Sequence, residues 1–383
     1  MIKVKIDNIE EILEWYKSLV LPIVTKNTIS RETSFAFEKT VESELNNSNV
    51  CSDILIMRLD KLIMKYEWIK KYVDLLDFHQ DLLLLRKISW TLLKATLFGS
   101  LLNLLNRYDN DLIVDITRSY LPSRQNINEI IEVICSTKKH FRDFITFVKD
   151  KIDIINGLIV QRFNYVDALG KSKLRAELAH KLNINVCPYC NRQYINPVTI
   201  NNNNKIYLGD IDHILPKSIY VLFQLSFFNL LPVCKVCNQL FKKDNKKRIL
   251  NPYFEGFDDD VYLIMKYKSV RELIGLDKPS EYLWTIKQDL EIDKLSKIQN
   301  NIDVFKLNEV YKSNDFDFQR VLRLKYEFES HAYWNSVKSI LAQGRKRPFV
   351  RFDEQLIYGV SLDENRFQDE ILSKAIHDIV FYN

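Results

Sequence analysis

Two pairs of cysteines, each with a two-residue spacer, form the strongest chemical pattern in the sequence. Cys187-Pro-Tyr-Cys190 and Cys234-Lys-Val-Cys237 use four of the six cysteines, and 43 residues lie between the pairs. Two thiolates three residues apart on a tight knuckle can bind one Zn²⁺ at about 2.3 Å, and a second knuckle completes a tetrahedron. The spacing predicts a closed, structural Zn²⁺ site. The alternative, a redox Cys-x-x-Cys motif beside ordinary core cysteines, needs a βαβ context that the sequence lacks.

A second group of polar residues lies between and just after the knuckles. Asp212-His213 comes first, Asn229 follows, and Asn238 stands directly after the last cysteine. In this order, and with the cysteine pairs on either side of the first three, these residues make the sequence similar to the HNH endonuclease family, the ββα-metal or His-Me finger nucleases, in its zinc-stapled branch. The resemblance covers Cys187 to Asp244, 58 of 383 residues. It implies a small ββα-metal core that hydrolyses DNA phosphodiester bonds.

Phosphodiester hydrolysis needs a water nucleophile, a proton acceptor and positive charge near the leaving oxygen. His213, with an ordinary imidazole pKa of about 6.5, can act as the general base. On a strand Asp212 would point to the opposite face, where its carboxylate and the amide oxygen of Asn238 suit Mg²⁺ or Mn²⁺. That catalytic cation would stabilise the departing 3′ oxygen. By the resemblance, Asn229 holds the backbone of the His213 loop.

Basic residues in and after the second knuckle are candidates for contacts with a nucleic-acid backbone, because positions 235 to 248 contain six basic residues and a single acidic one. The predicted nucleic-acid contacts are Lys242, Lys243, Lys246, Lys247 and Arg192. Double-stranded DNA is the expected partner. A further resemblance, to HNH proteins of bacterial mobile-element and phage-defence loci, adds antiviral defence as an expected role and a separate ATPase as a hypothetical partner.

Two other functions stay open on the sequence. In the first, the Asp-His pair and the asparagines are turn, capping and surface residues, and the chain is a non-catalytic zinc module that binds nucleic acid. In the second, the nuclease cleaves RNA, as a toxin would. Loss of metal-dependent cleavage in His213→Ala separates the first from catalysis, and the choice of substrate separates the second.

Composition excludes several other classes. Only 8 of 383 residues are glycine, and neither a Gly-x-Gly-x-x-Gly motif nor a phosphate loop occurs, so ATP hydrolysis by this chain is not expected. The start of the sequence lacks the apolar segment of a secretory signal, which predicts a cytoplasmic protein with reduced thiols. The stretch from Ile88 to Asn106 is interpreted as a buried helix rather than a membrane span. Cys51 and Cys135 are expected to be buried apolar residues.

These residues must be positioned by a mainly helical α+β protein. Residues 1–180 are expected to form a helical region for binding, positioning or partner contacts, because proline is rare there and apolar residues recur at helical spacing. One such series is Leu62, Tyr66, Ile69, Val73 and Leu76. Residues 181–252 are expected to form the zinc-bound HNH core, and residues 253–383 a mostly helical region. The last region has predicted helices at 319–341 and 364–380, and a basic cluster at Arg345, Lys346, Arg347 and Arg351.

Overall fold

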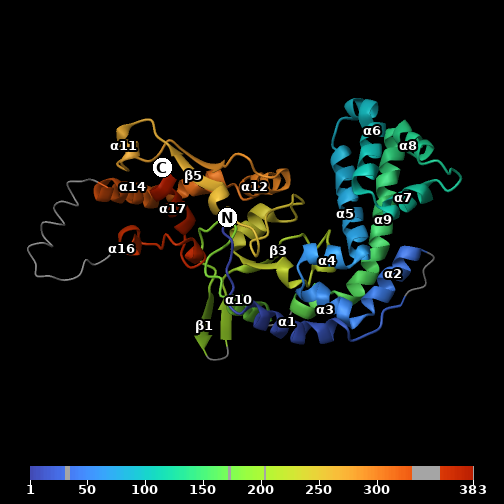
Figure 1. The fold of residues 1–383 in the computed structure, drawn as a ribbon, viewed down its shortest axis with the longest axis horizontal. Helices are drawn as coiled ribbons and strands as arrows, with labels where there is room; N and C mark the ends of the chain where they lie inside the picture. The colour runs from blue at the N-terminus through green and yellow to red at the C-terminus, as the bar shows by residue number, and fades with distance from the viewer. Residues whose placement is uncertain (31–34, 171–173, 202–203, 330–353, 383) are drawn as a thin grey trace, which may run out of the picture. The chain divides into compact units, whose positions relative to one another are not determined.

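The computed structural model describes residues 1–30, 35–170, 174–201, 204–329 and 354–382, and Figure 1 shows their fold. The described chain is α+β and mainly helical, as the sequence predicts. It separates into two compact units. Unit 1 comprises residues 1–9, 174–214 and 231–383, and unit 2 comprises residues 10–173 and 215–230.

Unit 2 is a bundle built around one long helix, α9 (Lys138–Arg162), which Figure 1 shows among its neighbours. Apolar residues of α9 are buried at steps of three and four, so one face along the length of the helix packs against its neighbours. Helices α2, α5, α7 and α8 pack against it. The remaining bounds are α1 (Ile9–Val24), α2 (Ala36–Leu45), α3 (Ser48–Ile56), α4 (Leu59–Lys65), α5 (Glu67–Leu85), α6 (Trp90–Tyr108), α7 (Asp111–Tyr120), α8 (Ile127–Ser136) and η1 (Val166–Gly170).

The segment 215–230, between the two cysteine pairs, belongs to unit 2 and not to the zinc-bearing unit. It carries two short 3₁₀ helices, η2 (Val221–Phe223) and η3 (Phe227–Asn229), and both pack against α3. The Tyr16 hydroxyl of α1 donates a 2.8 Å hydrogen bond to the Leu225 carbonyl. The sequence predicts a single core over 181–252, whereas the structure assigns the middle of that range to the helical bundle.

Unit 1 contains the cysteine pairs, three two-stranded sheets and the C-terminal helices. Its longest pairing joins β5 (Val261–Lys266) to β6 (Glu281–Ile286) in antiparallel register, and α17 (Ser373–Tyr382) packs against β5. The other elements are α10 (Leu174–Leu182), β1 (Pro197–Asn201), β2 (Asn204–Tyr207), β3 (Asp210–His213), β4 (Leu230–Val233), η4 (Val236–Lys242), η5 (Asp258–Asp260), α11 (Val270–Leu273), α12 (Ile292–Val304), α13 (Leu307–Val310), η6 (Tyr311–Asn314), α14 (Asp315–Glu329), α16 (Glu354–Tyr358) and η7 (Glu364–Arg366). Residues after 252 therefore share one unit with the cysteines.

Three expected helices differ from the structure. The series through Leu62 and Leu76 is broken at Tyr66, which has extended backbone angles, so α4 ends at Lys65 and α5 begins at Glu67. The last helix begins at Ser373 and not at Glu364, because Leu372 adopts a positive φ of 61° that interrupts helical geometry. The third, α14, spans Asp315–Glu329, and both the rest of the helix expected at 319–341 and the basic cluster at 345–351 lie outside the described residues.

The stretch from Ile88 to Asn106 forms most of α6, which buries Leu93, Leu97, Leu101 and Leu105 along one face. Among the helices of the described residues, none combines the length and apolar character that a membrane crossing requires.

Candidate functional site

The four paired cysteines meet in one buried cluster. Their Sγ atoms all lie within 4.8 Å of one another, and those of Cys190 and Cys234 are 3.9 Å apart. Ligands at about 2.3 Å around a tetrahedral Zn²⁺ lie about 3.8 Å apart, so the cluster has the dimensions of a zinc site. The four residues could therefore bind a metal ion such as zinc. Four protein thiolates complete the coordination of zinc and leave no open position for a substrate.

Each knuckle is a tight turn closed by a hydrogen bond from a backbone amide. The Cys237 amide donates to the Sγ of Cys234 at 3.4 Å, and the Asn191 amide donates to the Cys187 carbonyl at 2.8 Å. Asn191 has a φ of 50°, in the left-handed region that asparagine tolerates better than most residues. The asparagine directly after the first pair is therefore suited to end the knuckle.

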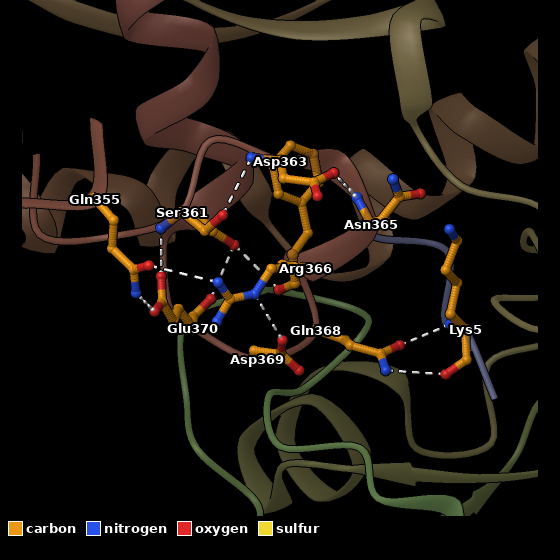
Figure 2. A network of polar contacts seen from close by, with 11 residues as sticks. Lys5, Gln355, Ser361, Asp363, Asn365, Arg366, Gln368, Asp369 and Glu370 are labelled. Carbon is orange, nitrogen blue, oxygen red and sulfur yellow. Dashed lines mark hydrogen bonds and ion pairs between the residues drawn. The ribbon is translucent and has the colours of Figure 1, made fainter. Parts of the chain in front are cut away.

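The C-terminal segment binds the first knuckle through Asn191. The Asn191 side chain is fully buried and donates to the Phe367 carbonyl at 2.8 Å, while its Oδ1 accepts from the Lys374 amide at 3.1 Å. Figure 2 shows the adjoining network, in which the Gln368 amide pairs with the backbone of Lys5 at 2.7 and 2.9 Å. Sequence reasoning missed this role of residues 361–374. The signal that the sequence offered was Asn191 itself, because asparagine is common where a turn requires a positive φ.

The strand β3 presents its acids and its histidine to opposite faces. Asp210 and Asp212 are two residues apart, so their side chains leave the same face of the strand, and His213 leaves the other. His213 is 7% exposed. The structure forms the strand that the predicted opposed arrangement of Asp212 and His213 requires.

Asp212 has two close partners in the structure. Its Oδ2 accepts a 2.7 Å hydrogen bond from the Tyr189 hydroxyl, and the Lys242 ammonium lies 3.0 Å from both carboxylate oxygens. Asp212 is 5% exposed and Lys242 3%. Burial raises the pKa of the Asp212 carboxyl above its usual value, and Lys242 and the Tyr189 hydrogen bond oppose that shift. Tyr189 is itself held by stacking on Phe305, with ring centroids 4.3 Å apart.

The π-helix η4 supplies the groups that face these acids. Its i to i+5 geometry includes a 2.9 Å hydrogen bond from the Lys243 amide to the Asn238 carbonyl. The side chains of Asn238 and Gln239 both donate to Oδ2 of Asp210, at 3.1 and 2.8 Å. Lys242, four residues after Asn238, also donates to the His213 carbonyl at 2.6 Å. One helix face therefore contacts Asp210, Asp212 and the backbone of the predicted base.

The predicted pair of cation ligands does not fit a divalent ion in this arrangement. The Asp212 carboxylate is already neutralised by the Lys242 ammonium, and a second cation on the same oxygens would be repelled at short range. The Asn238 amide is engaged by Asp210 and not by Asp212. The structure thus places Asp212 and Asn238 on the same side of β3, but it pairs each with a different residue.

Asn229 binds backbone groups within unit 2. Its Oδ1 accepts from the Leu215 amide at 2.7 Å, and its Nδ2 donates to the carbonyls of Leu215 and Phe223 at 3.1 and 2.9 Å. Asn229 is buried, and Leu215 is two residues after His213 in the chain. These contacts fix the backbone that follows the predicted base, which is the type of role the resemblance implies for Asn229.

The predicted nucleic-acid contacts fall into two groups. Lys243, Lys246 and Lys247 are exposed, with Lys247 in a 3.5 Å ion pair to Asp303. Lys242 is instead buried against Asp212, because the end of η4 turns it toward β3.

Arg192 is also engaged within its own unit, donating from Nε to the Asn314 side chain at 2.9 Å and from Nη2 to the Ser313 hydroxyl. Its guanidinium carbon lies 5.7 Å from the centre of the Tyr311 ring. Neither Lys242 nor Arg192 presents its charged group as the sequence led us to expect.

Comparison with known proteins adds no assignment to this geometry. No family model matches the chain, no curated protein is significantly similar to it, and no solved structure matches its fold. The likeness to HNH nucleases therefore depends on the motif residues themselves, of which the four cysteines form the cluster that the spacing predicts.

Proposed function

We propose that the protein is a metal-dependent endonuclease of the HNH type, which hydrolyses DNA phosphodiester bonds with His213 as the general base. The observation that carries the proposal is the position of His213. It ends the short strand β3, in the same unit as the buried four-cysteine cluster, and its carbonyl is fixed by Lys242, which is itself anchored to Asp212. Such fixed geometry is what a general base needs in order to meet a water molecule in one orientation.

Three residues of the chain have distinct roles in the proposed reaction. A neutral His213 imidazole takes the proton of the attacking water. Lys242 and Asn229 act as positioning residues, since the first holds the His213 backbone and the second holds the backbone two residues further along. Dependence on Mg²⁺ or Mn²⁺ is part of the proposal by resemblance.

A nucleic acid as the substrate is supported by the exposed basic residues that follow η4, namely Lys243, Lys246 and Lys247. Side chains of this kind bind phosphates without reading sequence. DNA is the proposed substrate, and defence against phage or the biology of mobile elements is the proposed setting, with a separate ATPase as the proposed partner.

The test is cleavage of supercoiled plasmid by the purified full chain in Mg²⁺, Mn²⁺ or EDTA, with zinc measured on the same samples. His213→Ala is compared with His180→Ala, because His180 is an exposed histidine of α10 in the same unit. We expect cleavage by the unmodified chain and by His180→Ala in either divalent cation, and none by His213→Ala or in EDTA. The same proteins are incubated with tRNA and mRNA.

Each outcome assigns a function. Cleavage of RNA with intact plasmid would replace DNA by RNA as the substrate. The folded, zinc-loaded chain could instead bind nucleic acid, equally well with and without His213→Ala, and cut neither substrate. That result would identify a binding module and overturn the proposal.

A further inference from the structure

Asp210, two residues before Asp212, lies in a different environment from Asp212, and this difference affects where a divalent cation can bind. Asp210 is half-buried, and its side-chain partners in the described chain are the neutral amides of Asn238 and Gln239. We propose that the divalent cation of the nuclease site is held by Asp210 with Asn238, and that Asp212 and Lys242 are positioning residues for His213. This inference rests on the proposed function and names the ligand set of that site.

The first step concerns the oxygens of Asp212. Magnesium and manganese ions bind carboxylate oxygens at about 2.1 Å and retain several waters. Both oxygens of Asp212 lie 3.0 Å from the Lys242 ammonium, one also accepts from Tyr189, and the side chain is 5% exposed. A hydrated divalent ion would have to displace the ammonium and the hydroxyl and open the buried cluster.

The second step concerns Lys242, which is held by more than Asp212. Its ammonium donates to the His213 carbonyl at 2.6 Å, and the side chain is almost fully buried. Withdrawal of Lys242 would release the backbone of the base and leave a buried carboxylate behind. The pair is therefore better suited to hold His213 than to exchange with a metal ion.

The third step is the geometry around Asp210. Two adjacent ligands of an octahedral ion at about 2.1 Å lie about 3.0 Å apart. The Asn238 Nδ2 and the Asp210 Oδ2 are 3.1 Å apart. If the Asn238 side-chain amide turns by 180°, its oxygen takes the place of its nitrogen. The nitrogen faces Asp210 when the two groups are hydrogen-bonded directly, and the oxygen would face it when both bind a cation. With a cation present, Asp210 and Asn238 would supply two oxygens at the spacing that the ion requires.

The charge balance points to the same residue. Asp212 and Lys242 cancel each other, whereas Asp210 forms no ion pair with a basic residue in the described part of the chain and is contacted by the neutral amides of η4. A divalent cation is attracted to the carboxylate that lacks an ammonium partner and that is open enough to admit its waters.

The experiment measures Mn²⁺ binding to the zinc-loaded full chain by water-proton relaxation, a readout independent of cleavage. Asp210→Asn is compared with the double variant Asp212→Asn/Lys242→Met, which removes one charge of each sign. Asp244→Asn is the control for a lost acid near η4, because Asp244 is exposed. We expect Asp210→Asn to weaken Mn²⁺ binding at least tenfold, and the double variant and the control to stay within about threefold of the unmodified chain.

Zinc content and circular dichroism establish that each variant is folded, and Asp210→Ser replaces Asp210→Asn if the latter is not. Loss of Mn²⁺ binding in the double variant with retention in Asp210→Asn would overturn the inference, as would equal binding in all variants or no binding by the unmodified chain. Plasmid cleavage on the same samples tests the proposed function separately. If the chain cuts DNA but the variants do not show this pattern of Mn²⁺ binding, the proposed function stands and the inference is wrong. If the variants bind Mn²⁺ as expected but the chain does not cut DNA, the proposed function is wrong.

Discussion

Lys242 and Asp212 form an ion pair in which both side chains are almost fully buried, with 3.0 Å between the ammonium and the carboxylate. The pair joins η4 to β3, and the same ammonium reaches the carbonyl of His213. Buried pairs of this kind are costly to break on one side, since the remaining charge is left without a partner.

We therefore predict that Lys242→Met alone destabilises unit 1 by about 3–5 kcal/mol, whereas Lys242→Met/Asp212→Asn is close to neutral. The measurement is the urea concentration at which zinc is released, because the cysteine cluster lies in the same unit. Lys243→Met, one residue further and exposed, is the control. Equal destabilisation by the single and the double variant would contradict a coupled pair.

The four-cysteine cluster leads to a second prediction. The purified protein should contain about one zinc per chain, and Cys187→Ser or Cys234→Ser should lose it, because three thiolates no longer close the tetrahedron. Since metal-binding energy contributes to folding, a strong chelator should also unfold unit 1. Cys135→Ser, outside the cluster, should retain its zinc. Full zinc content in both cluster variants would rule out a four-thiolate site.

Asn191 supports a third prediction because it joins the first knuckle to the C-terminal segment. Asn191→Ala removes hydrogen bonds to the backbone of Phe367 and Lys374 and places alanine at a positive φ. The expected loss is about 3 kcal/mol, with zinc released at lower urea. Asn191→Gly, which relieves only the backbone strain, should recover part of it. A variant with unchanged zinc release would show that the knuckle does not depend on residues 367–374.

The sequence predicts the parts of this protein that depend on local spacing. Two cysteine pairs identify the cluster, and apolar periodicity with the scarcity of proline identifies residues 1–180 as mostly helical. It does not predict the break at Tyr66, because the apolar spacing continues unchanged through it, whereas in the structure Tyr66 has extended backbone angles and its hydroxyl bonds the distant Asp53. Lys242 stands in a basic run that is typical of a solvated surface, so its burial depends on the tertiary position of Asp212. The use of residues 215–230 by the helical unit is likewise a long-range property.

Asn229 supports a fourth prediction, on the backbone after His213. Asn229→Ala removes the contacts to the Leu215 amide and carbonyl and to the Phe223 carbonyl. Plasmid cleavage should fall mainly in kcat, since the backbone after the base loses its support, and stability should fall by about 2 kcal/mol. Asn229→Asp keeps an acceptor for the Leu215 amide but no donor, so its kcat and stability should lie between those of the unmodified chain and of Asn229→Ala. Unchanged kcat in Asn229→Ala would show that the clamp is irrelevant to cleavage.

The last prediction concerns Cys51, which is fully buried in α3 and donates to the Leu45 carbonyl at 3.2 Å. Burial raises the pKa of the Cys51 thiol from 9.0 to about 11, with the nearby Arg162 opposing the shift. A raised pKa means that the folded state favours the protonated thiol. The stabilising contribution is therefore complete below about pH 9 and is lost as the pH rises toward 11.

At pH 8 the thiolate fraction of Cys51 should be about a hundredfold lower than that of an unperturbed thiol, and alkylation should be correspondingly slow. The measurement is the rate of alkylation of the zinc-loaded Cys135→Ser chain, with and without urea. Cys51→Ala should remove the loss of unit 2 stability between pH 9 and 11. Rapid alkylation of Cys51 in the folded chain at pH 8 would show that its thiol is accessible, and that Arg162 outweighs burial.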